Sequence, residues 1–215
     1  MTVPLIAMQQ TNPYAPTAAS LTEPSEQVPA EQGRATLEYA GFWRRFLAYW
    51  IDFAFFIPVM LLAYYAGEKS KLFNLYWFAP GLALGLFFHV YLVQAYGGTP
   101  GKLIMKTRIA MVDGAPVTAR AATVRYSVLF VLSALQTLGI VLGTLAMSDE
   151  HYFSLSYLAR AQRTVELAPA WYSAVAIFVQ VWVWGEFVSM LFNKKRRAIH
   201  DFMAGTIVIR STHVA

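Results

Sequence analysis

Four long apolar stretches follow a polar N-terminal segment in this chain. They run over residues 46–66, 72–95, 126–147 and 171–192, with polar or charged segments between them. Each is close to the roughly 20 residues that an α-helix needs to cross about 30 Å of hydrocarbon. The pattern therefore predicts an all-α membrane protein in which four transmembrane helices form a bundle.

The composition agrees with a protein that folds in lipid. The chain is 57% hydrophobic and 13% charged, whereas a soluble domain averages about 45–50% apolar and about 25% charged residues. It contains no cysteine, which excludes disulfides, cysteine nucleophiles and thiolate metal sites. The expected partners then depend on where the charges lie.

The N-terminal segment differs from the rest of the chain. Residues 1–38 are rich in Pro, Gln, Thr, Ala and Glu and show almost no apolar periodicity. Such a segment cannot bury enough apolar surface to offset the entropy of ordering it, so we expect a disordered cytoplasmic tail. It also lacks the basic start and the long apolar core of a signal peptide. The folded transmembrane domain should then span residues 39–211.

Lysines and arginines fix the expected orientation of the spans. Of the 17, thirteen fall in the N-terminal segment, the loop before the third stretch and the C-terminal segment, and four fall in the other two loops. Positive residues stay cytoplasmic, so both termini and the loop at residues 96–125 should face the cytoplasm from the cell's inner membrane. The formal net charge of +5 then reflects topology and attraction to anionic lipid. Nucleic acid is not an expected partner.

This cytoplasmic loop opens with YGGTPGKLIMK at residues 96–106. A nucleotide-binding P-loop needs four residues between its glycines and a Ser or Thr after its lysine. Here only three residues separate Gly97 from Gly101, and leucine follows Lys102. The motif therefore does not predict a nucleotide site. Thr99-Pro100 is instead typical of a helix start, and we expect a tight turn and a short helix at the membrane surface.

The same loop is basic and should lie in the membrane interface. The cations expected to contact anionic lipid headgroups or the loop itself are Lys102, Lys106, Arg108 and Arg125. For Lys102 the expected partner is a lipid phosphate or an acidic side chain. Further along, Asp113-Gly114 stands between two apolar runs, which is a hairpin signal. The sequence thus predicts a basic interfacial loop on the cytoplasmic side of the bundle.

Three ionisable residues lie inside the predicted spans, namely Asp52, His89 and Glu186. Each stands six residues from the cytoplasmic end of its span, which at 1.5 Å per residue places each about 9 Å below the inner boundary. Ionisable groups at such a depth are costly and are candidates for an ion or substrate pathway. The alternative is that these side chains only hold helices together through hydrogen bonds.

Three motifs resemble, in their order, those of the RDD family of membrane proteins. GFWRRFLAYWID carries Arg45 and Asp52 at the spacing of the family's arginine and first aspartate. GGTPGKLIMKTRI resembles the segment between the helices, and RRAIHDFMAGTIVI places Asp201 on the second aspartate. The resemblance covers residues 39–211. It implies a polytopic bacterial membrane protein, for which transport of unidentified ligands is the usual suggestion.

A structural pair between Arg45 and Asp201 is also expected. Arg45 stands at the inner end of the first span, and the apolar segment after the basic run KKRR should return Asp201 to the same level. A pair at that depth would dock the C-terminal segment beneath the bundle. The alternative is that the Arg45 side chain reaches a lipid phosphate.

These observations favour a small transporter or transport subunit for ions or small solutes. It would be coupled to protons or cations through Asp52, His89 and Glu186, and four helices are few for a complete pathway, so we expect a homo-oligomer. The alternative is a membrane scaffold or assembly factor that recruits a protein partner through its tail or its basic loop. We find no motif for a metal ligand set, a cofactor or an enzyme nucleophile.

Overall fold

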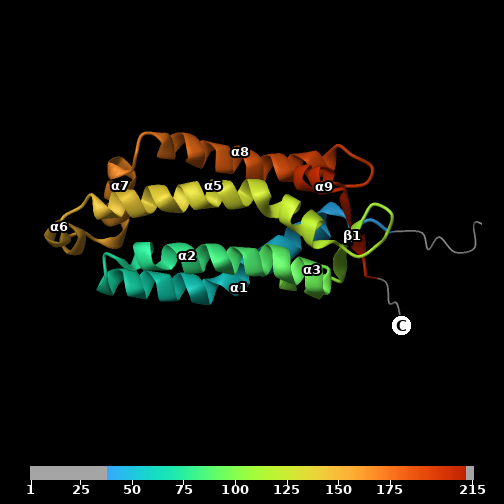
Figure 1. Ribbon diagram of the computed structural model, residues 1–215, viewed down its shortest axis with the longest axis horizontal. Coiled ribbons are helices and arrows are strands. Elements are labelled where there is room, and N and C mark those ends of the chain that lie inside the picture. Colours follow the sequence, from blue (N-terminus) through green and yellow to red (C-terminus); the bar gives the residue numbers. More distant parts are fainter. Residues whose placement is uncertain (1–37, 212–215) are drawn as a thin grey trace, which may run out of the picture. The chain divides into compact units, whose positions relative to one another are not determined.

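The computed structural model describes residues 38–211, so residues 1–37 of the predicted tail at residues 1–38 lie outside the described part of the chain. Helices and short connecting elements make up this part (Figure 1). The elements that form the four spans are α1 (Phe42–Lys69), α2 (Phe73–Leu86), η1 (Phe87–Tyr91), α3 (Leu92–Tyr96), α5 (Ala119–Leu145) and α8 (Trp171–Leu191). All four predicted spans are therefore present as long apolar helices.

Shorter elements connect the spans. They are α4 (Pro100–Ile104), β1 (Thr107–Met111), α6 (Asp149–Ser154), α7 (Tyr157–Leu167), α9 (Ile199–Ala204) and β2 (Thr206–Arg210). Several helix starts are set locally, because a hydroxyl accepts an orphan backbone N–H there. Thr118 accepts from Ala121 at the start of α5, and Ser148 accepts from the backbone of His151 at the start of α6.

The second span is not a regular α-helix along its whole length. Between α2 and α3 it passes through η1, a π-helical turn centred on His89. π-Helical turns inside α-helices are rare and are frequent at functional sites.

A two-stranded antiparallel sheet joins the loop between the second and third spans to the C-terminal segment. In it β1 pairs with β2, with Ile109 opposite Val208, and the Ala40 N–H donates to the Val208 carbonyl over 2.9 Å. The Asp-Gly turn forms, with Gly114 at φ +89°, but it does not return a second strand as predicted. Pro116 makes only one isolated bridge to Ala110, because proline lacks the N–H that a ladder needs.

The opposite end of the helices is closed by α6 and α7 (Figure 1). Arg160 on α7 forms an ion pair of 2.8 Å with Glu68 at the end of α1. The Tyr152 hydroxyl on α6 donates to the Gly67 carbonyl over 3.0 Å. The first and third loops therefore share one end of the bundle, and the sheet lies at the other, as the alternation of four spans requires.

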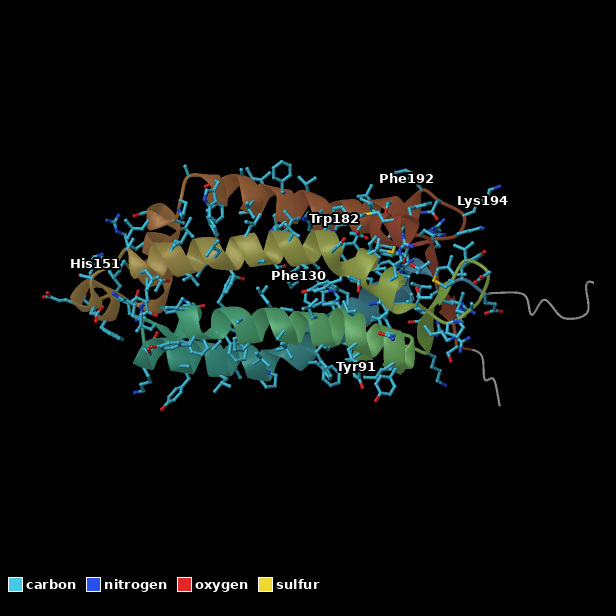
Figure 2. All side chains as sticks on the ribbon, in the orientation of Figure 1. Tyr91, Phe130, His151, Trp182, Phe192 and Lys194 are labelled. Atoms are coloured by element: carbon cyan, nitrogen blue, oxygen red, sulfur yellow. The ribbon has the colours of Figure 1, made fainter. Side chains whose placement is uncertain are left out.

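The outer surface of the helices is apolar along their middle. Leu61 on α1 is 63% exposed, and Ile177 and Trp184 on α8 are 64% and 65% exposed. Figure 2 shows nitrogen and oxygen atoms gathered towards the two ends, near His151 at one and Lys194 at the other. A surface of this kind is stable in hydrocarbon and not in water.

Candidate functional site

The YGGTPGK loop docks α4 onto the first span. The Asp52 carboxylate accepts a hydrogen bond from the Gly101 backbone N–H at 2.7 Å and one from the Thr99 hydroxyl at 2.6 Å. A Cβ atom on Gly101 would collide with the Ala48 carbonyl oxygen and lie 2.8 Å from Asp52 Oδ1. The start of α4 is therefore capped by a carboxylate from α1, and only glycine permits so close an approach.

At the same end, Asp201 is fully buried and joins three elements. Arg45 Nη2 on α1 lies 2.6 Å from Asp201 Oδ2, so the pair expected from the sequence is present. Arg125 on α5 contacts the other carboxylate oxygen, and the Ala198 N–H donates to Oδ2 over 2.9 Å. Burial opposes ionisation, but Arg125 and Arg45 together hold the pKa of the Asp201 carboxyl well below its usual range.

The position of Arg125 corrects a sequence expectation. It was expected to contact lipid headgroups or the loop, but it is only 9% exposed, and besides Asp201 it donates to the Thr206 hydroxyl. The reason is that α9 packs against α5 and brings the carboxylate of Asp201 to the first turns of that helix. The arginine is thereby satisfied inside the protein.

His200 extends this network to the fourth span. Its Nε2 atom lies 2.8 Å from Arg125 Nη2, and its Nδ1 atom lies 2.6 Å from Glu186 Oε2. Because a guanidinium can only donate, Nε2 must be the unprotonated nitrogen, which leaves the proton on Nδ1 facing the carboxylate. Burial, followed by the charge of Arg125, lowers the pKa of the His200 imidazole, in keeping with a neutral ring.

A cavity of about 180 Å³ lies beside this network, among α1, α5 and α8. Its walls include the apolar side chains of Leu129, Trp182 and Phe187, and Trp182 comes from the middle of α8 (Figure 2). The acidic and basic residues that line it are Arg45, His89, Lys102, Arg125, Glu186 and His200. Four spans thus contribute polar groups to one partly apolar space.

The structure brings only two of the three predicted pathway residues together. His89 and Glu186 line the cavity, and the His89 ring stacks on Tyr126 with centroids 4.7 Å apart. Asp52 does not line it, because its oxygens are occupied by α4. The link from Asp52 to the cavity runs through Thr99, whose hydroxyl accepts from Lys102 Nζ over 3.3 Å.

Lys102 is a second correction. It was expected to meet lipid phosphate or an acidic side chain at the membrane surface, but it lines the cavity. The docking of α4 on α1 turns this side of the short helix inward. Lys106 and Arg108 are exposed, so their contact with headgroups stays a prediction.

Sequence reasoning missed the roles of His200 and Thr99. His200 meets Glu186, fourteen residues earlier, only because the chain turns back after α8. That turn is closed by Asn193, which accepts from the Arg197 N–H at 2.7 Å and donates to the Arg197 carbonyl at 2.7 Å. No periodic pattern in the sequence marks such a turn.

Comparison with known proteins gives one match. The model of the RDD family matches residues 39–205, a range that contains Arg45, Asp52 and Asp201. No curated protein and no solved structure matches the chain. The matched range contains every residue that lines the cavity.

Proposed function

Because this chain belongs to the RDD family of membrane proteins, we propose that it is a small transporter or transport subunit for ions or small solutes. The observation that carries this proposal is the cavity lined by six acidic or basic residues from α1, η1, α4, α5, α8 and α9. Ionisable groups inside membrane-spanning helices are costly and usually mark a pathway. The cavity is the solute site in this proposal.

Coupling to protons follows from the groups around this site. Glu186 and His200 form a close pair on one wall, and His89 belongs to the same lining. A proton taken up by this pair changes the charge facing the solute. Proton binding and solute binding then affect each other, which is the thermodynamic requirement for coupling. In this proposal the protein acts as a homo-oligomer, because the four helices of one chain are few for a complete transport pathway.

We also propose that the sheet end faces the cytoplasm of a bacterial inner membrane, with both termini inside. The excess of lysine and arginine at that end supports this orientation. Single cysteines test it without background, since the chain has none. Ser156→Cys should react with an impermeant maleimide in intact cells, and Ser211→Cys only after permeabilisation. The reverse pattern would overturn the orientation.

Transport itself is tested by reconstitution. The purified protein in proteoliposomes should move a cation or a small solute together with protons, and Glu186→Gln should abolish the coupled flux. The control is Glu166→Gln, because Glu166 lies on exposed α7 and pairs only with Arg163 among the described residues. Absence of flux for every cation and solute tried, with folded wild-type protein, would reject the proposal.

A further inference from the structure

We propose that the ligand of this cavity is a small zwitterion, a solute that carries both a carboxylate and an ammonium group, as an amino acid does. This inference rests on the proposed function, since it takes the cavity as the solute site. It goes further by naming the chemical class of the solute. Two side chains of opposite charge, each with spare hydrogen-bonding capacity, carry the argument.

The first is Lys102, a cation that is not paired with the Asp201 carboxylate. Arg45 and Arg125 also line the cavity, but both are held by the single carboxylate of Asp201. Within residues 38–211 the Lys102 ammonium has one hydrogen bond, to Thr99 at 3.3 Å, and no carboxylate oxygen within 4.0 Å. An ammonium offers three donors, so Lys102 can still bind a carboxylate.

The second is Glu186, the anion of the cavity lining. Its side chain is 12% exposed, and its ion-pair contact is with His200 at 2.6 Å. That imidazole is neutral, because its other nitrogen accepts from Arg125. No lysine or arginine nitrogen in the described residues lies within 4.0 Å of the Glu186 carboxylate, so its charge has no permanent partner there. The Glu186 carboxylate can therefore bind the ammonium group of a ligand.

Together, these two groups discriminate between classes of ligand. A simple anion would gain from Lys102 but would bring its charge beside Glu186. A simple cation would gain from Glu186 but would face Lys102 and the two arginines. Only a solute with both charges satisfies both groups, because a charge placed beside a like charge is strongly disfavoured.

Size and wall chemistry narrow the class further. The cavity volume of about 180 Å³ corresponds to roughly six water molecules at about 30 Å³ each. That space is below the ~300 Å³ of typical drug-sized sites and suits a solute the size of an amino acid. The walls formed by Leu129, Trp182 and Phe187 suit a short hydrocarbon part between or beside the charges.

The test is a ligand series with wild-type protein in nanodiscs, measured by calorimetry and thermal shift. The zwitterions are glycine, leucine, γ-aminobutyrate and 6-aminohexanoate, which vary the charge separation and the apolar part. Butyrate and butylammonium are the single-charge controls. At least one zwitterion should bind about tenfold or more tightly than both controls. If butyrate or butylammonium binds as tightly as the best zwitterion, the inference is overturned. It is also overturned if none of the compounds binds.

Two variants assign the charges. In Glu186→Gln, which keeps the oxygen that accepts from the His200 backbone, the preference for the zwitterion over butyrate should disappear. In Lys102→Gln the preference over butylammonium should disappear, whereas Lys106→Gln, an exposed position, should behave as the wild type does. Unchanged preferences in both folded cavity variants would contradict the assignment. If either variant does not fold, the wild-type series still decides.

The outcomes separate this inference from the proposed function. Zwitterion binding without any flux in proteoliposomes would reject transport and leave the ligand class standing. Flux of butyrate or of a metal cation without zwitterion binding would support transport and reject the ligand class.

Discussion

Asp201 is the residue on which the structure of the sheet end of the bundle depends most. It is 0% exposed and neutralises arginines from two different spans. Its carboxylate also accepts from the Ala198 N–H at the start of α9. Two guanidiniums this deeply buried are stable only while that carboxylate is ionised. The charge network is therefore a structural element as well as the rim of the cavity.

Replacing the central carboxylate should be severe. Asp201→Asn should lower the free energy of unfolding by about 3–5 kcal/mol, because both arginines lose their counter-charge. Arg45→Met should cost less in the Asp201→Asn background than in the wild type, and chemical denaturation of the four proteins measures the difference. A double charge swap would not restore stability, since Arg125 would then face a second arginine. Additive losses in the cycle would contradict the shared network.

Gly101 tests the close approach of the α4 backbone to the α1 backbone. Gly101→Ala should destabilise the protein by about 1–3 kcal/mol, because the new methyl group meets the Ala48 carbonyl, a rigid backbone atom. The matched control is Gly41→Ala, where nothing lies within 4 Å of an added Cβ and the cost should be below about 1 kcal/mol. Thermal melts followed by size-exclusion chromatography report both. Equal effects at the two glycines would argue against the docked α4.

The free energy of unfolding should depend on pH through the protonation of His200. Its pKa is lowered from 6.5 by burial and by Arg125, so the unfolded chain takes up a proton there below about pH 6.5 while the folded protein does not. Stability should therefore fall as the pH drops from 6.5 towards the lowered folded pKa. His200→Gln should remove that part of the slope in melts between about pH 5 and 7.5. His151→Gln, at an exposed site, should keep it, and a His200→Gln profile parallel to the wild type would contradict the assignment.

At the scale of elements, short segments are stabilised by partners far away in the chain. The start of α4 is capped by Asp52 from α1, and α7 is tied to the other end of α1 by Arg160. Arg160 also lies over the Tyr152 ring, 4.3 Å from its centroid, and donates to the Leu155 carbonyl over 3.0 Å. One arginine thus fixes both helices of the loop to the first span.

The loop should loosen when this arginine is removed. Arg160→Met should lower stability by roughly 1–3 kcal/mol, since it leaves a partly buried carboxylate and carbonyl without their donor, and should speed cleavage by a protease added on that side. Arg163→Met, in an exposed pair with Glu166, should stay within about 0.5 kcal/mol of the wild type. Similar cleavage rates for the two variants would show that the tie is not needed.

The sequence reveals the spans and one long-range pair, and the reason is physical. Runs of about 20 apolar residues have one stable solution in lipid, and Arg45 and Asp201 share a depth set by the ends of two spans. The trans cap on α4, the strand pairing of β1 with β2 and the inward turn of Lys102 depend on contacts between distant segments. Local propensity does not encode those contacts, so the predicted hairpin and the expected headgroup or loop contacts of Arg125 were wrong.

For the whole molecule, transport requires that the space among α1, α5 and α8 admits water and solute. Substituted cysteines on α5 test it directly, because Leu129 lines the cavity while Val131, two residues on, is 54% exposed on the outside of the helix. In membrane vesicles, a charged, membrane-impermeant methanethiosulfonate reagent should modify Leu129→Cys and leave Val131→Cys unmodified. A bound solute should slow the first reaction. Failure of the reagent to reach Leu129→Cys from either side of the membrane would contradict a solute pathway at this site.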